Sequence, residues 1–345
     1  MIVKPNLFIV GAAKSGTTSL WNYLKQHPEV FMPEDELNKE PAYFSSISGD
    51  LQLQSYLNLF SKAGKDHAYI GEASTAYLTD PISAGRIHCF NPDSKIIIIL
   101  RNPAERAYSL YNWMVQDGYE FSERFEDALQ LEVFRRSVRS VPNWYEPQYF
   151  WNYMYFESGL YVNQVKRYIE LFGGKSVLVL KFEALISSPK SVLQQICNFL
   201  NISYIEGKFQ KENPSRKVYS ASIQFILRKI TDYVLANRSI NVNQLISIVS
   251  DAETRLSRCV NYDYKKRVFL RDLLLSILDT IQTNDYVGIF ETKKERDILL
   301  NFGILDGRPE RLSVVTKNVL NYYYKNEINI LRSYMDTDLN DWPSV

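Results

Sequence analysis

The sequence has few cysteines and few histidines, and neither set is arranged as a structural or metal-binding framework. The 345 residues include only three cysteines, at widely spaced positions: Cys89, Cys197 and Cys259. An odd, scattered set supports neither a disulfide framework nor a zinc site, which favours a reducing compartment. The three histidines are equally far apart: His27, His67 and His88. A metal cluster is therefore not expected.

An excess of charge and a long apolar run are also lacking. The chain has 40 lysines and arginines against 39 acidic residues, without a basic cluster, so charge does not suggest a nucleic-acid partner. No apolar run approaches the roughly 20 residues that span a bilayer. The first expected strand begins within a few residues of Met1, which leaves no room ahead of it for a signal peptide or anchor. We expect a cytoplasmic, bacterial protein without a membrane span.

A segment near the start of the chain has the composition of an anion-binding loop. The apolar run 7–10 is followed by residues 11–20, Gly-Ala-Ala-Lys-Ser-Gly-Thr-Thr-Ser-Leu. A strand that runs through a small-residue turn into a helix leaves backbone N–H groups unpaired at the positive end of the helix dipole. The glycines allow close approach of a phosphate, and Lys14 adds a full charge. Further donors come from four hydroxyl groups: Ser15, Thr17, Thr18 and Ser19.

The residue order in this loop differs from that of nucleoside triphosphatases. Their phosphate loop is G-x-x-x-x-G-K-[ST], with lysine after the second glycine. Here Lys14 stands two residues before Gly16. The strand expected at 95–100 also ends in Arg101, where a triphosphatase would have an aspartate for magnesium. Both features count against a P-loop kinase or ATPase, which stays open as an alternative, as does a tight turn with an exposed lysine.

The loop resembles the 5′-phosphosulfate loop of the sulfotransferases that use 3′-phosphoadenosine 5′-phosphosulfate (PAPS). The shared pattern is a lysine, a small residue, a glycine, a threonine and a further hydroxyl or small residue, here residues 14–18. The resemblance implies that Lys14 neutralises charge on the oxygen that links phosphate to sulfur. It also implies that the loop N–H groups and hydroxyls hold the 5′-phosphate. PAPS would be the co-substrate, and no metal would be required.

A second segment is similar to the place where these sulfotransferases bind the 3′-phosphate of PAPS. The family uses an arginine and a serine eight residues apart, which here are Arg101 and Ser109. A guanidinium fork and a hydroxyl suit a phosphate monoester, and open α/β sheets bind ligands at the carboxyl ends of their strands. The alternative is that Arg101 caps the following helix or pairs with Glu105.

The segment 39–44, Lys-Glu-Pro-Ala-Tyr-Phe, resembles the part of the glycan-modifying sulfotransferases that supplies the catalytic base. In that branch a glutamate stands shortly before a pair of aromatics, and Glu40 matches it. A base is needed because a neutral alcohol is a poor nucleophile. The alternative is an ordinary surface carboxylate. Glu72 is a second candidate acid or base and ranks below Glu40. In many of these relatives a lysine follows the corresponding glutamate, whereas here the next residue is Ala73.

The alternation of strands and helices predicts the fold. Strands without polar alternation, such as 95–100 and 177–180, are typical of a buried parallel sheet. We expect an α/β fold: a three-layer sandwich with a central parallel sheet, similar to the P-loop-like sulfotransferase fold. Helices are expected at 17–26, at 161–172 and after Ser188, which with Pro189 would begin a helix. Glu183, between the strand and that helix, is expected to be structural.

The later part of the chain is less informative. Residues 213–217, Asn-Pro-Ser-Arg-Lys, occupy the place of a basic loop that folds over the nucleotide in sulfotransferases, so Arg216 and Lys217 are candidates for the 3′-phosphate; an exposed basic turn is the alternative. We expect one domain, 1–345, with a helical insertion at 220–312 that contains amphipathic helices at 223–234 and 270–281. The stretch 318–342 resembles the closing helix and terminal tryptophan of the family.

These observations favour a PAPS-dependent sulfotransferase that transfers a sulfuryl group to an acceptor hydroxyl, or to an amine, and releases adenosine 3′,5′-bisphosphate. The expected acceptor is a glycan, a small metabolite or a lipid, and the sequence neither decides among them nor gives the oligomeric state. A second alternative is a nucleotide-binding protein without catalytic activity. It would bind the bisphosphate and transfer nothing.

Overall fold

The chain divides into two compact units. The computed structural model describes residues 4–34, 38–46, 51–138, 149–206, 216–237, 247–252, 254, 304–305, 308–335, 339–340 and 342. The first unit comprises Met1–Ala107, Phe156–Asn213 and Ser313–Val345, and the second comprises Tyr108–Tyr155 and Pro214–Leu312. Each unit is described by itself. The expectation of one domain with an insertion at 220–312 stays a prediction.

A parallel sheet forms the centre of the first unit. Its order is β2 (Val30–Phe31), β3 (Tyr69–Glu72), β1 (Leu7–Gly11), β4 (Lys95–Leu100) and β5 (Val177–Lys181). All pairings are parallel. β1 and β4 are buried on both faces, as their continuous apolar runs predict. The short edge strand β2 was not expected from the sequence.

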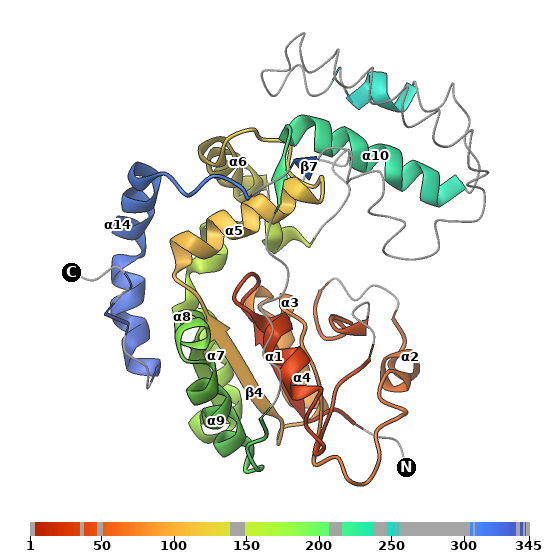
Figure 1. Ribbon diagram of the computed structural model, residues 1–345, viewed down its shortest axis with the longest axis vertical. Coiled ribbons are helices and arrows are strands. Elements are labelled where there is room, and N and C mark those ends of the chain that lie inside the picture. Colours follow the sequence, from red (N-terminus) through yellow and green to blue (C-terminus); the bar gives the residue numbers. More distant parts are fainter. Residues whose placement is uncertain are drawn as a thin grey trace. The chain divides into compact units, whose positions relative to one another are not determined.

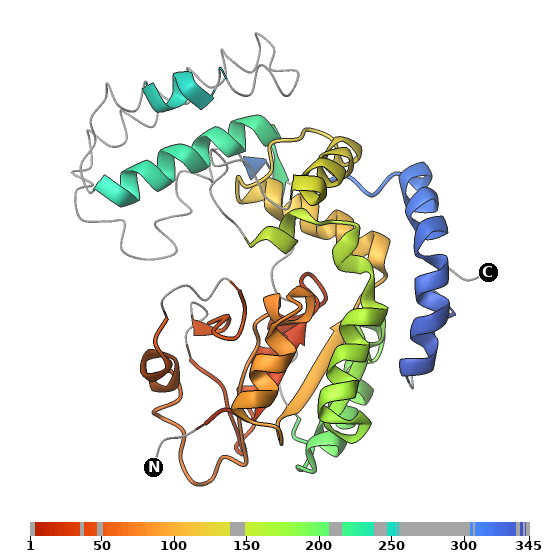
Figure 2. The same cartoon turned by 180° about the vertical axis from the view of Figure 1, so that it is seen from behind.

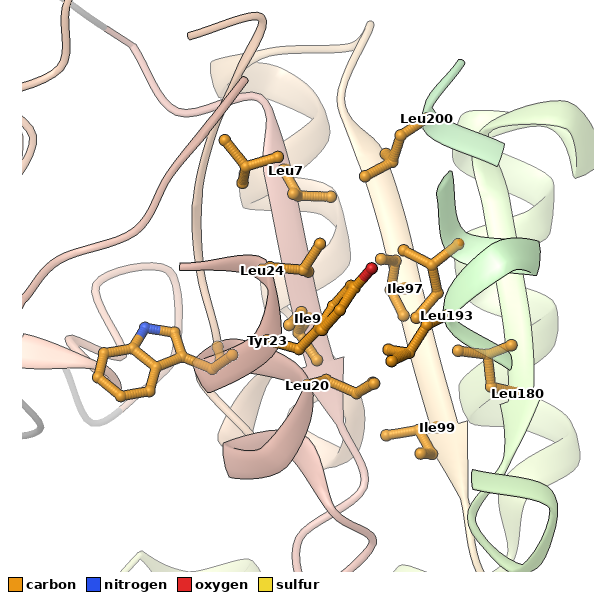
Figure 3. Packing of buried hydrophobic residues seen from close by; sticks show 14 of the residues in the cluster. Leu7, Ile9, Leu20, Tyr23, Leu24, Ile97, Ile99, Leu180, Leu193 and Leu200 are labelled. Atoms are coloured by element: carbon orange, nitrogen blue, oxygen red, sulfur yellow. The ribbon is translucent and has the colours of Figure 1, made fainter. Parts of the chain in front are cut away.

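One face of the sheet is covered by helices that pack on alternate strand residues. These helices are α1 (Thr17–Leu24), α8 (Phe182–Ser187) and α9 (Pro189–Leu200). Figure 3 shows Leu20 and Leu24 of α1 and Leu193 of α9 against the sheet. They meet Ile9 of β1 and Ile97 of β4 in one cluster of buried side chains. This apolar cluster anchors the strand and the helix on either side of the loop 11–16.

The opposite face is covered by α3 (Ala76–Thr79), α4 (Ser83–Phe90) and α7 (Tyr161–Phe172), so the first unit has the expected three layers (Figures 1 and 2). The Tyr168 hydroxyl of α7 donates to the Tyr77 carbonyl of α3 at 2.8 Å. α14 (Val314–Leu331) packs on α7, and the Tyr324 hydroxyl donates to the Phe156 carbonyl at 2.8 Å. Short helices complete the unit: α2 (Leu53–Asn58), η3 (Glu157–Gly159), η4 (Gly174–Ser176) and η5 (Arg332–Tyr334).

The second unit is mainly helical where the structure describes it. α5 (Pro103–Gln116) begins in the first unit and continues into the second, which also contains α6 (Phe125–Val138), η2 (Phe150–Tyr153) and α10 (Ala221–Asn237). A short antiparallel pair joins β6 (Lys217–Val218) to β7 (Ile304–Leu305). Buried Glu120 forms an ion pair with Arg135 at 2.9 Å and accepts a hydrogen bond from the Tyr155 hydroxyl at 2.8 Å.

The secondary structure agrees with most expectations. α7 has the predicted bounds, α10 includes the helix predicted at 223–234, and α1 ends two residues before the predicted Gln26. Pro189 begins α9 as predicted, but the Ser188 side chain makes no capping hydrogen bond, so that part of the prediction is wrong. The helix predicted at 270–281 lies outside the described residues. Within the described ranges, no helix has the length and apolar character needed to cross a bilayer.

Candidate active site

The loop between β1 and α1 curls around two residues in the left-handed region. Lys14 has φ of 65° and Gly16 has φ of 88°. Glycine adopts this conformation without a steric penalty, and at residue 16 the space is also restricted, because a Cβ would lie 3.0 Å from the Phe182 ring. Gly16 is the N-cap residue of α1 and makes no side-chain capping hydrogen bond. It therefore leaves the first amides of α1 without the bond that a capping side chain at this position would provide.

The hydroxyl groups of the loop are suited to an anionic group. The Ser15 side chain is fully buried, and its Oγ has no hydrogen-bond partner among the described residues. Thr17 and Ser19 are buried at the start of α1, whereas Thr18 is half-buried. A buried hydroxyl without a partner is costly unless a ligand or water satisfies it. The uncapped helix and the Ser15 hydroxyl therefore fit the 5′-phosphate end of PAPS.

Arg101 follows the last residue of β4, beside this loop. Its Nη1 donates to the Lys14 carbonyl at 3.2 Å, and its guanidinium carbon lies 5.0 Å from the centre of the Phe182 ring. The Tyr161 hydroxyl donates to the Arg101 carbonyl at 2.9 Å. Burial lowers the pKa of Arg101, while Glu105 and Glu183 act to raise it. An arginine stays charged after such a shift, so Arg101 is a cation next to the loop.

The alternative pairing of Arg101 with Glu105 is not what the structure shows. Glu105 Oε1 lies 2.5 Å from the ammonium group of Lys317 on α14. Within the described part of the chain, no carboxylate lies within 4.0 Å of the Arg101 guanidinium to form an ion pair with it. The guanidinium therefore keeps its charge for another anion.

Three further predicted residues belong to the second unit. Ser109 is half-buried in α5, the Arg216 amide donates to Gln116 Oε1 at 2.8 Å, and Lys217 is exposed at the start of β6. Their expected part in 3′-phosphate binding, together with Arg101, stays a prediction.

Glu40 is held by donors on both of its oxygens. Oε1 accepts from the buried Lys39 ammonium at 2.5 Å. Oε2 accepts from the Thr75 hydroxyl at 2.8 Å and from the Thr75 amide at 3.2 Å. Burial acts to raise the pKa of Glu40, but the Lys39 charge and the hydrogen bonds outweigh it and lower the pKa. The carboxylate is ionised and 41% exposed, as a proton acceptor must be.

Glu72, the second acid or base predicted, is enclosed at the end of β3. It accepts from the Tyr56 hydroxyl at 2.7 Å, from the Tyr77 hydroxyl at 2.8 Å and from the Ser74 hydroxyl. Its side chain is fully buried, and burial raises its pKa to about 7. The Ser74 hydroxyl also accepts from the Ala42 amide at 3.0 Å. Glu72 thus supports the turn that carries Thr75. Of the two glutamates, Glu40 is the one that a substrate can reach.

Sequence reasoning missed several residues that hold this site. Lys39 and Thr75 act through contacts with Glu40 that no sequence motif predicts, although Lys39 precedes Glu40 directly in the chain. Glu183 has the structural role expected of it, because it accepts from the Asn102 amide at 2.9 Å and from Trp342 Nε1 at 3.1 Å. Among the residues that the structure describes, no group of His, Cys, Asp or Glu side chains has the arrangement of a metal site.

Comparison with known proteins agrees with these features. The chain is 32% identical to a sulfotransferase of Alicyclobacillus acidocaldarius whose crystal structure is known, and the match covers 72% of this chain and 97% of that chain with a TM-score of 0.53. It is 26% identical over 205 residues to mouse bifunctional heparan sulfate N-deacetylase/N-sulfotransferase 1, covering 58% of this chain and 22% of that protein. It is 25% identical over 264 residues to mouse carbohydrate sulfotransferase 15, covering 59% and 45%.

The chain therefore spans less than half the length of these two mouse relatives. A family model described as the sulfotransferase domain matches residues 4–221. The matched range includes the loop, the Glu40 segment, and β4 with Arg101 after it. The resemblance inferred from the loop is confirmed. Because this match extends over more than half of the sequence, the chain belongs to the sulfotransferase domain family.

Proposed function

We propose that the protein transfers a sulfuryl group from PAPS to a hydroxyl or an amine of an acceptor and releases adenosine 3′,5′-bisphosphate. The observation that carries the proposal is the contact between Arg101 and Lys14, which puts a half-buried guanidinium beside an anion-binding loop. A nucleotide with phosphates at two ends requires two cationic sites, and these residues supply them from separate segments.

The loop residues have binding and electrostatic roles. The amides at the start of α1 and the hydroxyls of Ser15, Thr17, Thr18 and Ser19 hold the 5′-phosphate end. The ammonium of Lys14 stabilises negative charge that develops on the bridging oxygen. Bound PAPS supplies an activated sulfuryl group whose transfer resembles in-line phosphoryl transfer, where catalysis consists largely of positioning and electrostatics.

Glu40 removes the acceptor proton at one of its carboxylate oxygens. Lys39 and Thr75 keep it ionised and fix its orientation, so it is a base before the acceptor arrives. The proton passes from the acceptor oxygen or nitrogen to Glu40 while that atom forms its bond to sulfur. No metal ion takes part in the proposed reaction.

A glycan or a small metabolite is the proposed acceptor. The mouse relatives are named for heparan sulfate and carbohydrate, which supports a glycan. Ala73 stands where many glycan-modifying relatives have a lysine that helps to hold an anionic sugar, so a less charged acceptor is preferred. The cysteine content supports a reducing compartment such as the cytoplasm as the proposed setting.

The proposal is tested with PAPS labelled in its sulfuryl group. The protein is incubated with glycan and metabolite pools, and label transfer is followed alongside calorimetric binding of adenosine 3′,5′-bisphosphate. We expect bisphosphate binding without metal and label in one acceptor pool. Binding of the bisphosphate without transfer, unchanged in Glu40→Gln, would support the non-catalytic alternative. Tight binding of ATP with magnesium and no heat with the bisphosphate would support the kinase or ATPase and refute the proposal.

A further inference from the structure

Two acidic side chains lie close enough to Arg101 for their charges to act on it. They are Glu105, in the first turn of α5, and Glu183, in the first turn of α8. A carboxylate paired with an arginine competes with a phosphate for the same guanidinium fork. An arginine that binds a phosphate must therefore not be paired with a neighbouring carboxylate.

Glu105 is engaged by the C-terminal part of the chain. Its Oε1 lies 2.5 Å from Lys317 Nζ, and both side chains are partly exposed, Glu105 at 34% and Lys317 at 39%. Lys317 is in the first turn of α14, whose start is fixed by Ser313, because its hydroxyl accepts from the Thr316 amide at 3.2 Å. The ion pair both occupies and neutralises Glu105.

Glu183 is engaged by the same part of the chain. Its Oε2 accepts from the indole N–H of Trp342 at 3.1 Å, and its Oε1 accepts from the Asn102 amide at 2.9 Å. Trp342 is almost fully buried, and its ring lies 6.3 Å from that of Tyr161. Both oxygens of Glu183 thus have donors other than Arg101.

α14 is anchored to the first unit. The Val162 amide of α7 donates to Glu327 at 2.6 Å, and the Tyr324 hydroxyl packs so closely on Gly159 that a Cβ there would lie 2.6 Å from it. Lys317 is therefore carried by a helix with a defined position next to α7. Its contact with Glu105 is therefore supported by the packing of this helix.

We infer that two residues of the C-terminal part of the chain, Lys317 of α14 and Trp342, support the nucleotide site: they hold the two neighbouring carboxylates and so leave the Arg101 guanidinium to a phosphate. The inference rests on the proposed function and assigns these two residues a role in it. Lys317 and Trp342 are positioning residues, because they act through Glu105 and Glu183 and need not touch the nucleotide.

The first test is Lys317→Met, which removes the charge and keeps the aliphatic stem. Released Glu105 competes for Arg101, so the Kd for adenosine 3′,5′-bisphosphate should rise about threefold to fivefold, as expected for a partly exposed ion pair. Adenosine 5′-monophosphate, which lacks the 3′-phosphate, should bind with a Kd within about twofold of its wild-type value. Calorimetry measures both ligands. The matched control is Lys166→Met, which breaks an exposed ion pair with Glu170 on α7 and should change neither Kd.

The second test is rescue. Adding Glu105→Gln to Lys317→Met removes the competing charge and should restore the wild-type Kd for the bisphosphate. A merely structural role for Lys317 predicts no such restoration. Glu105→Gln alone should bind the bisphosphate at least as tightly as the wild type, which keeps the inference testable if Lys317→Met does not fold. Trp342→Phe, which removes the indole N–H together with part of the buried ring, should weaken bisphosphate binding in the same direction.

Four results would overturn the inference: an unchanged Kd in Lys317→Met, a loss that Glu105→Gln does not restore, an equal loss for adenosine 5′-monophosphate, or weaker binding of the bisphosphate by Glu105→Gln alone. Absence of bisphosphate binding in the wild type would instead refute the proposed function, and the inference with it. The two failures are therefore distinguishable.

Discussion

The guanidinium of Arg101 donates a hydrogen bond of 3.2 Å to the main-chain carbonyl of Lys14, across 87 positions of sequence. This bond joins the end of β4 to the loop that follows β1, and these strands are neighbours in the sheet. Parallel strands present their carboxyl ends at one edge, which is where open α/β sheets bind ligands. The two cationic residues are brought together by this pairing.

Replacing Lys14 tests its catalytic role. Lys14→Met should lower kcat by about a hundredfold or more, because it removes the positive charge that, in the proposed reaction, stabilises the developing negative charge. Adenosine 3′,5′-bisphosphate should still bind, since the loop amides and Arg101 remain. The measurement is single-turnover sulfuryl transfer together with calorimetry. Normal turnover by Lys14→Met would refute the role.

Glu40→Gln should abolish the base while leaving nucleotide binding intact. The expected loss in kcat is about 10² to 10⁴, the usual contribution of a general base. Because Lys39 and Thr75 lower the pKa of Glu40 below its ordinary 4.5, wild-type kcat should stay level on the acid side down to about pH 5. It should fall only as the carboxylate becomes protonated below that range.

The acid side of the same pH profile tests Thr75. Thr75→Val removes the hydroxyl that donates to Glu40 at 2.8 Å, so the pKa of Glu40 should rise and the acid limb of kcat should move upward by about half a unit to one unit. Thr79→Val, which changes a threonine whose hydroxyl donates to the Ala76 carbonyl at 3.3 Å in the same short helix, is the control. An identical profile in the wild type and Thr75→Val would contradict the proposed contact.

Glu72 predicts a pH dependence of stability. Burial raises its pKa from 4.5 to about 7, so between these values the folded state binds more protons than the unfolded state. The stability contributed by the protonated group is complete below about pH 4.5 and is lost as the pH rises through 7. Urea unfolding at pH 5 and 7.5 should show a loss of about 1 to 3 kcal/mol in the wild type that Glu72→Gln lacks. Equal pH dependence in both proteins would contradict the shift.

Gly16→Ala tests the geometry of the loop. At φ of 88° a Cβ is strained and would lie 3.0 Å from Phe182, so we expect a loss of about 1 to 2 kcal/mol in stability and weaker bisphosphate binding. Gly85→Ala is the control, because in α4 nothing lies within 4 Å of the added Cβ. It should be neutral or stabilise by about 0.5 to 1 kcal/mol. Thermal unfolding and calorimetry distinguish the two variants.

The elements that depend on local sequence were predictable. Continuous apolar runs identify β1, β4 and β5, and α7 follows from its apolar spacing and the glycines after it. The wrong detail was the Ser188 cap, because Pro189 begins α9 without the side-chain bond that serine offers. Ser109, Arg216 and Lys217 stay predictions, because they belong to the second unit.

The sequence by itself determined the family, the parallel sheet and the presence of Lys14, Glu40 and Arg101, because each of these is encoded by neighbouring residues. Only the tertiary structure decided which groups control those side chains. Thr75 reaches Glu40 across 35 positions, and Lys317 reaches Glu105 across 212. Contacts at such separations arise from the packing of whole strands and helices, so they cannot be predicted from a short stretch of sequence.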